Sequence, residues 1–407
     1  MTDGLGGALN GIRVIELARI LAGPWAGQTL ADLGAEVIKV ERPGIGDDTR
    51  EWGPPYARDE SGAERPGMSA YFLGTNRGKR SITLDFAKPE GAEIARRLID
   101  TADVVTENFK VGGLAPYGLD YPTLAARNPK LIYCSITGFG QDGPYAPRAG
   151  YDFIIQGMGG LMSISGMPGG EPMKSGIAVS DLFTGFYASI GVLAALHEAR
   201  ATGRGKHIDL ALFDAQVATL SNQALSYLVS GKTPAPMGNT HPSIVPYQVF
   251  ATADGHMIVA AGNDGQFARL CDVAGVPDMA KDPCYATNPA RVVHRAELVP
   301  QLAAIIAAKP SRFWLEGLER AGVPAGPINT VAQTFADPQA AARGLHQTLP
   351  LADGGTVPSV ATPLRVAGKH PEPAQAPPRL GQHTDRILGE LGIDAAGIAR
   401  LRAQGIV

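Results

Sequence analysis

The feature of this sequence that most limits its possible folds is a strand–helix–strand pattern near the N-terminus. Residues 12–16 (IRVIE) and 36–41 (EVIKVE) are short apolar segments typical of buried strands. Residues 22–35 between them predict a helix, with Pro24 in its first turn. Because sheets built from such units are normally parallel, with right-handed crossovers, we predict an α/β protein with a parallel sheet.

Later segments extend this pattern as far as residue 230. Further strands are predicted by the segments SITLD, ADVVTENF, LIYCSIT and HIDLAL. Residues 88–101 predict an amphipathic helix, and residues 181–200 predict a long apolar one. A single helix is expected after the strand HIDLAL. We therefore expect one large domain over residues 1–230.

A second, smaller domain is expected after a stretch of turn residues at 231–246. The segment YQVFATADGHMIVAAG predicts a β-hairpin with an Asp-Gly turn. Helices are predicted next, at 264–274, 295–308 and 311–321. We expect an α+β domain over 231–330 and a separate C-terminal segment over 331–407.

Composition excludes several classes of function. The net charge of −3 and the lack of a Lys/Arg run argue against a nucleic-acid partner. Three cysteines, without a CxxC pair, predict neither a disulfide framework nor a zinc site. No apolar run approaches the roughly 20 residues of a membrane span, and the first residues do not resemble a signal peptide. We expect a cytoplasmic protein with no membrane association.

Two acids frame a glycine-dense segment from 150 to 181. Asp152 opens it, and Asp181 stands at or next to the N-cap of the long apolar helix. Backbone N–H groups at a helix N-terminus favour an ionised carboxylate. The seven glycines from Gly157 to Gly176 leave a backbone that a ligand can approach closely. The residues alone leave two interpretations of Asp181 open, a helix cap and a functional acid.

Basic residues suggest contacts with an anion, and known motifs limit the chemistry. Arg42 follows the second predicted strand, and the cluster RGKR includes Arg77 and Lys79. A solvated loop would explain the cluster equally well. Glu41 ends the second strand as in dinucleotide-binding folds, but GxGxxG is missing, which weakens an NAD-dependent dehydrogenase. HExxH and GxSxG are absent too, so we predict no metal site and no serine hydrolase.

Several separated motifs, in order, resemble those of the class III CoA-transferases of the formyl-CoA transferase (CaiB-BaiF) type, a family similar to the α-methylacyl-CoA racemases. The resemblance covers essentially the whole chain. It rests on GIRVIELARILAGPWAGQTLADLGAEVIKVERPGIGDDTR, NRGKRSITLD, ENF with its glycine turn, ITGFGQDGPYAPRAGYD, TGRGKHIDLALFDA and LGQHTDRILGELG. The stretches GNTHPSIVPYQVFATADG, RVVHRAELV and GVPAGPINTVAQTFADPQ resemble members that use succinyl-CoA and dicarboxylates.

The resemblance implies roles for individual residues. Asp181 is the nucleophile, which would form acyl-anhydride and aspartyl-CoA thioester intermediates, and Asp152 is an accessory acid. Tyr151 stands where the racemases have histidine, which disfavours racemisation because tyrosine is a poor acid–base group near neutral pH. His241 and Ser243 belong to a substrate loop that is a run of glycines in formyl-CoA transferases. CoA contacts are implied for Arg19, Ile20, Ala22, Arg42, Leu84, Asn108 and Phe109. Arg77 and Lys79 of the basic cluster are added to these as candidate CoA contacts.

The family resemblance also implies the wider organisation. It predicts a Rossmann-like large domain completed by the C-terminal segment, a smaller domain, and a homodimer of two interlocked chains. CoA and acyl-CoA are substrates, and no permanently bound cofactor is expected. The alternatives are an α-methylacyl-CoA racemase, an NAD-dependent dehydrogenase and a catalytically silent CoA-binding protein.

The acceptor is predicted to be a dicarboxylate, whose unreacted carboxylate needs a cation or another hydrogen-bond donor once water is excluded. Candidates for this partner are Arg77, Arg148 and His241. A competing hypothesis is an apolar acyl pocket formed by Met158, Met162 and Phe183.

Overall fold

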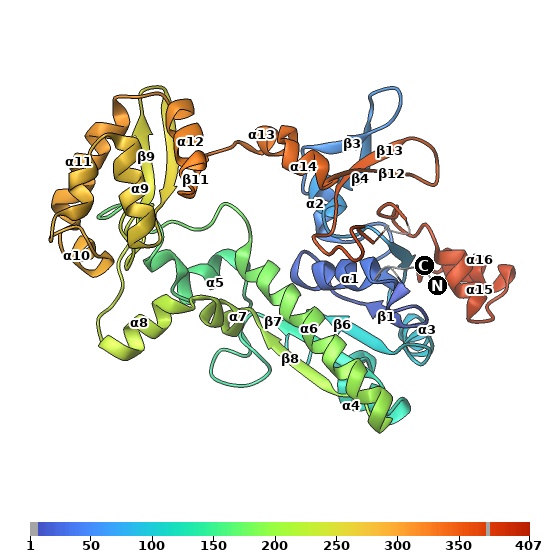
Figure 1. Cartoon of the computed structure of the whole chain (residues 1–407). Helices are drawn as coiled ribbons and strands as arrows, with labels where there is room; N and C mark the ends of the chain where they lie inside the picture. Colours follow the sequence, from blue (N-terminus) through green and yellow to red (C-terminus); the bar gives the residue numbers. More distant parts are fainter. Residues whose placement is uncertain (1–6, 372–374) are drawn as a thin grey trace. The chain divides into compact units, whose positions relative to one another are not determined.

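The computed structural model describes residues 7–371 and 375–407, and the chain divides into two compact units (Figure 1). Unit 1 comprises Met1–Leu161, Lys174–Ser230 and Pro338–Val407. Unit 2 comprises Met162–Met173 and Gly231–Asp337. The glycine-dense segment is therefore shared between them, because its middle part clusters with unit 2.

Unit 1 is built on a six-stranded parallel sheet. Its strands lie in the order β5-β2-β1-β6-β7-β8, which confirms the parallel sheet predicted from the strand–helix–strand pattern. Counted along the chain, this order is 3-2-1-4-5-6, so the winding reverses between β1 and β6. Open α/β sheets bind ligands beyond the carboxyl ends of the strands at such a reversal. The strands are β1 (Arg13–Glu16), β2 (Glu36–Glu41), β5 (Lys79–Thr83), β6 (Val104–Glu107), β7 (Ile132–Thr137) and β8 (His207–Ala211).

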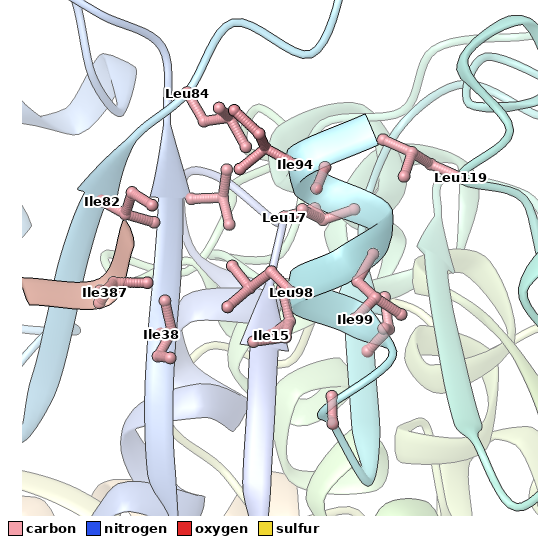
Figure 2. Close-up of a cluster of buried hydrophobic side chains, with 14 of the residues drawn as sticks. Ile15, Leu17, Ile38, Ile82, Leu84, Ile94, Leu98, Ile99, Leu119 and Ile387 are labelled. Carbon is pink, nitrogen blue, oxygen red and sulfur yellow. The ribbon is translucent and has the colours of Figure 1, made fainter. Parts of the chain in front are cut away.

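Helices cover both faces of this sheet, because neighbouring strand residues point to opposite sides. Val14 packs in the core under α1 and α6, whereas Ile15 packs in the core under α3. Figure 2 shows Ile15 and Ile38 turned towards Leu98. Ile387 joins the same core, so the C-terminal helices are part of unit 1. The helices on the two faces are α1 (Ala22–Asp32) and α6 (Val179–Thr202), then α3 (Pro89–Ile99), α4 (Tyr121–Arg127), α15 (Thr384–Glu390) and α16 (Ala395–Ala403).

Two local features of unit 1 differ from the sequence expectation. A helix, α5 (Asp152–Met158), forms at the start of the glycine-dense segment. The single helix expected after β8 is two helices, α7 (Leu212–Thr219) and α8 (Asn222–Ser230), separated at Ser221, whose φ of 50° interrupts a right-handed helix. The remaining elements are η2 (Asp48–Glu51), β3 (Tyr56–Arg58), β4 (Glu64–Ser69), α2 (Ala70–Leu73), η3 (Ala115–Tyr117), η4 (Leu161–Ser163, which continues into unit 2), α14 (Pro338–Ala342), β12 (His346–Pro350) and β13 (Thr356–Val360).

Unit 2 is an antiparallel sheet with helices packed against it. The predicted hairpin is present as β9 (Tyr247–Thr252) and β10 (Gly255–Ala260), and β11 (Ala325–Pro327) pairs with β10. The core includes Trp314, whose indole N–H donates to the carbonyl of Ile306 at 2.9 Å. The helices are α9 (Asp264–Ala274), η5 (Pro277–Lys281), α10 (Asn288–Val293), α11 (Arg295–Ala307), α12 (Ser311–Arg320) and α13 (Val331–Ala336).

Candidate active site

Asp181 lies in the first turn of α6, as the third residue of the helix. The helix begins at Val179, two residues earlier than predicted, and its N-cap is Ala178, which has no side-chain cap. The predicted position at or next to the N-cap is therefore corrected to the third helical residue. Backbone N–H groups of a first turn still favour negative charge there.

Asp152 supplies the cap that Ala178 cannot. One carboxylate oxygen of Asp152 accepts from the backbone N–H of Ser180 at 2.9 Å and of Asp181 at 3.4 Å. The other oxygen accepts from the side-chain amide of Gln156 at 2.7 Å. The first acid of the glycine-dense segment thus fixes the start of the helix that carries the second acid.

Two buried glutamines extend this network on either side of the helix start. The Gln156 side-chain oxygen accepts from the backbone N–H of Ser175 at 2.8 Å. The Gln216 side-chain oxygen accepts from the hydroxyl of Ser180 at 2.7 Å. A Cβ at Gly159 would lie 2.5 Å from Cγ of Gln216, so only glycine fits beside it. The first turn of α6 is consequently held by α5 and α7.

Burial raises the pKa of Asp181 to about 7, and the negative charge of Asp152 adds to the rise. The sequence had suggested a firmly ionised carboxylate. In the structure, burial and the neighbouring acid outweigh the helix N-terminus, so Asp181 changes protonation near neutral pH.

Tyr71 is a site residue that the motifs did not single out. Burial, together with the charges of Asp181, Asp152 and Asp47, raises the pKa of this phenol to about 12. Tyr71 lies on the short helix α2, with its ring edge-on to Trp52 at 5.1 Å between centroids. Its hydroxyl therefore keeps its proton at neutral pH, and the charges of the acids contribute to this. The only sequence signal was an aromatic residue in the loop-rich region after β2.

Tyr151 directly precedes α5 and is 57% exposed. Tyr151, at the position of the racemase histidine, is therefore open to solvent in the described chain. It is next to Asp152 in sequence, but its side chain takes no part in the hydrogen bonds that cap α6.

Several residues predicted to contact CoA surround one cavity of about 440 Å³ in unit 1. It lies where β1, β2, β5 and β6 end, at the reversal of the sheet order. Asn108 holds the loop after β1 in place, because its side chain accepts from the Arg19 N–H at 2.9 Å and donates to the Arg19 carbonyl at 2.7 Å. The predicted residues that line the cavity are Arg19, Arg42, Leu84 and Phe109.

Ile20 and Ala22 belong to the same loop and to the start of α1. Ile20 has a φ of 72°, and its N–H points to the carboxylate of Asp47. Ala22 is the buried first residue of α1. Ile20 directly follows Arg19 in the chain, but neither Ile20 nor Ala22 is among the residues that line the cavity.

Arg77 and Lys79 do not line the cavity, and their assignment as CoA contacts is corrected. The guanidinium of Arg77 pairs with both oxygens of Asp32, at 2.8 and 2.5 Å. The ammonium of Lys79 is fully buried and donates to both oxygens of Glu16 at 2.9 Å. Burial lowers the pKa of Lys79 to about 8. The basic cluster stabilises the interior of unit 1, which local charge in the sequence could not distinguish from an anion site.

His241 and Ser243 belong to unit 2, in a loop with several backbone tethers. The N–H of Ser243 donates to Nδ1 of His241 at 3.0 Å. The Asn288 side chain donates to the carbonyl of Ser243 at 2.9 Å, and Arg295 donates to that of His241 at 2.8 Å. Among the described residues, no cluster of three or more His, Cys, Asp or Glu side chains could hold a metal ion.

Comparison with known proteins identifies the family. The model of CoA-transferase family III matches residues 9–384 of the chain. This chain belongs to CoA-transferase family III. The family resemblance drawn from the motifs is thereby confirmed.

Relatives in this family match over nearly their whole length. The chain is 54% identical over 383 residues to the succinate–glutarate CoA-transferase of Agrobacterium fabrum, covering 94% of this chain and 95% of the relative. It is 42% identical over 400 residues to the succinyl-CoA:glutarate CoA-transferase of Mus musculus, covering 98% and 90%. The crystal structure of a CAIB/BAIF family protein from Brucella suis superimposes with a TM-score of 0.83 at 54% identity, covering 94% and 99%.

Proposed function

We propose that this family III member transfers CoA from succinyl-CoA to a dicarboxylate acceptor, with Asp181 as the nucleophile. The observation that carries the proposal is the half-buried carboxylate of Asp181 at a helix start fixed by Asp152. A cavity lined by Arg19 and Arg42 in the same unit supports CoA binding, since guanidinium groups suit phosphate recognition. The names of the two relatives support the choice of acids.

The reaction follows from the chemistry of a carboxylate nucleophile. The ionised Asp181 attacks the thioester carbonyl. The C–S bond breaks, CoA departs as the thiolate, and a mixed acyl-aspartyl anhydride forms. The thiolate then attacks the Asp181 carbonyl, which releases the donor acid and leaves an aspartyl-CoA thioester. The acceptor carboxylate attacks this carbonyl and releases the thiolate again. Attack of the thiolate on the acceptor's carbonyl forms the new acyl-CoA and restores Asp181.

Each of these steps passes through a tetrahedral oxyanion, which needs hydrogen-bond donors. Tyr71 supports this part of the proposal because its raised pKa keeps the phenol protonated within the electrostatic reach of Asp181. The bare backbone of the glycine-dense segment is a second source of donors. No step requires a metal or redox cofactor.

The acceptor's free carboxylate needs its own partner in this proposal. Arg77 is excluded because its guanidinium is committed to Asp32. Arg148 is exposed and lies over the rings of Tyr145 and Phe139, at 4.5 and 5.5 Å. Arg148 and His241 remain the candidates. An apolar acyl pocket would instead use exposed side chains such as Phe183, which is 43% exposed.

The test is a transfer assay with purified protein and succinyl-CoA. We expect glutarate and other dicarboxylates to be used with a kcat/KM at least about tenfold above acetate and butyrate, because a site that pairs a charge rejects analogues lacking it. Equal or better use of the monocarboxylates would contradict the dicarboxylate acceptor. Exchange of the α-proton of an acyl-CoA with solvent deuterium, without CoA transfer, would favour the racemase.

We also propose an interlocked homodimer of cytoplasmic location, as the family resemblance implies. Its support in unit 1 is an apolar surface on α6 and α8. An 18-residue window of α6 has a mean hydropathy of 1.5, but only 44% of that window is buried in the single chain. By length and composition alone, the same helix could also span a membrane. The exposed side chains that need a cover are Phe183, Phe186, Tyr187, Ile190, Leu225, Tyr227, Leu228 and Val229.

A further inference from the structure

We propose that Asp47 is a positioning residue, which holds the backbone of Ile20 in a left-handed conformation at the edge of the CoA cavity. The inference rests on the proposed function in one respect, namely that this cavity binds CoA. Asp47 contacts no reacting group, and we expect it to affect CoA binding only through the conformation of Ile20.

The conformation of Ile20 is the first observation. Its φ of 72° lies in the left-handed region, which a β-branched side chain rarely adopts. Such a residue stays there only where its surroundings hold it. Its N–H donates to both carboxylate oxygens of Asp47, at 3.3 and 3.2 Å.

The second observation is that Asp47 is itself rigidly held. Its carboxylate is buried and forms a salt bridge with the fully buried ammonium of Lys39 at 2.8 Å. The backbone N–H and hydroxyl of Thr49 donate to the same carboxylate at 3.0 and 2.7 Å. Although burial opposes ionisation, these partners lower the pKa of Asp47 to about 2, so the acceptor stays charged.

The same ion pair holds the loop at a second point. The ammonium of Lys39 also donates to the carbonyl of Ala18 at 2.9 Å. Arg19, between the two tethered residues, has its N–H and carbonyl bonded to Asn108. The chain from β1 to α1 is thus fixed at three successive residues by side chains of other elements.

This loop and its tethers form one wall of the cavity. Arg19, Lys39 and Asp47 all line the cavity of about 440 Å³. The φ of Ile20 sets the direction in which the chain leaves Arg19 for the first turn of α1. If Ile20 relaxed to a right-handed or extended conformation, Arg19 and the start of α1 could not both keep their places at the cavity.

A purely structural role for Asp47 makes a different prediction. Asp47 is also the N-cap of η2, where its side chain accepts from the Thr49 N–H. Loss of that cap would lower stability whatever residue stood at position 20. If Asp47 instead acts by holding Ile20, its effect on CoA affinity should depend on which residue stands at position 20. Glycine adopts a positive φ without strain, so with glycine there Asp47 would no longer be needed.

The experiment is a double-mutant cycle with CoA binding as the readout. The Kd for CoA is measured for the wild type, Asp47→Asn, Ile20→Gly and the double variant. Asp47→Asn keeps one oxygen but loses the salt bridge to Lys39 and the second acceptor for the Ile20 N–H. We expect it to raise the Kd roughly tenfold with Ile20 present, because the competent loop is then populated less often. In the Ile20→Gly background the same change should raise it by less than about threefold.

Thr49→Val is the matched control, since it removes one hydrogen bond to Asp47 without touching the contact to Ile20. We expect it to lower the melting temperature and leave the Kd for CoA near the wild-type value. An Asp47→Asn effect of equal size in both backgrounds, or none in either, would overturn the positioning role. A wild type that fails to bind CoA would instead refute the CoA site and with it the proposed function.

Discussion

At the scale of single residues, Asp181 combines two demands that oppose each other. A nucleophile must be ionised, but burial and Asp152 raise the pKa of Asp181 from 3.8 to about 7. The free energy of unfolding and the rate of attack therefore respond to pH in opposite directions. The folded state retains a proton that the unfolded chain has lost between those two pKa values, so wild-type stability falls as pH rises through that window.

The first prediction concerns Asp181→Asn. This change removes the ionisable group and should abolish CoA transfer. It should also raise the free energy of unfolding relative to the wild type, more at about pH 8 than at about pH 4, because only the ionised aspartate is penalised by burial. Denaturant melts at the two pH values check this. A variant that is less stable than the wild type at the higher pH would show that the ionised Asp181 chiefly stabilises the first turn of α6.

The second prediction concerns the pH dependence of the first chemical step. Only the ionised Asp181 attacks the thioester, so kcat/KM for the acyl-CoA donor should rise through pH 7 and level off above it. Asp152→Asn removes the neighbouring charge and should move this rise to lower pH. A profile that falls through pH 7 would contradict the nucleophile.

The site residues also show which roles could be predicted from the sequence and which could not. The two acids of the glycine-dense segment were found from their setting, and the structure links them through the start of α6. The prediction that Arg77 and Lys79 contact CoA was wrong, because a cluster of basic residues has the same local sequence whether it faces solvent, a ligand or a buried acid. Their partners, Asp32 and Glu16, are 45 and 63 residues away in the chain. Only the fold reveals such pairings.

At the scale of elements, the start of α6 depends on α5 and α7. The predicted start was late because Ala178 is not a typical capping residue, and the actual cap, Asp152, lies outside the helix. β2 and α9 had clear periodicity and turn residues at their ends, so their bounds were predicted as observed. α5 was missed because its sequence runs directly into a series of glycines.

The third prediction tests this capping arrangement. Asp152→Ala removes both acceptor oxygens and should lower the free energy of unfolding by about 0.5–2 kcal/mol, as expected of a lost N-cap. Asp152→Asn keeps one acceptor for the Ser180 N–H and should cost less. Thermal or denaturant melts compare the two variants. Equal stability of Asp152→Ala and the wild type would show that the cap is not needed to fix α6.

At the scale of the whole molecule, the parallel sheet could be predicted because the strand–helix–strand pattern permits few alternatives. The periodicity of the chain could not predict the assembly, since the apolar residues of α6 are equally consistent with a core helix. The dimer was implied by the family resemblance alone.

The fourth prediction is that the wild type is a dimer by light scattering. The paired change Leu228→Asp and Val229→Asp on α8 should weaken it, because these side chains are 72% and 84% exposed in the single chain.

Val293→Asp is the control for this experiment, because Val293 is a comparably exposed apolar residue of unit 2, at 77%. It should leave the mass of the particle unchanged. A wild-type protein that stays monomeric at all concentrations tested would contradict the dimer.

The central claim is that Asp181 becomes covalently acylated, and trapping the intermediate tests it most directly. The protein is incubated with succinyl-CoA and then with hydroxylamine or borohydride, which react with an activated carboxyl group. Mass spectrometry of the peptides should place the modification on Asp181 and on no other acid, and Asp181→Asn should remain unmodified. A label on Asp152, or no label on an enzyme that transfers CoA, would contradict the account.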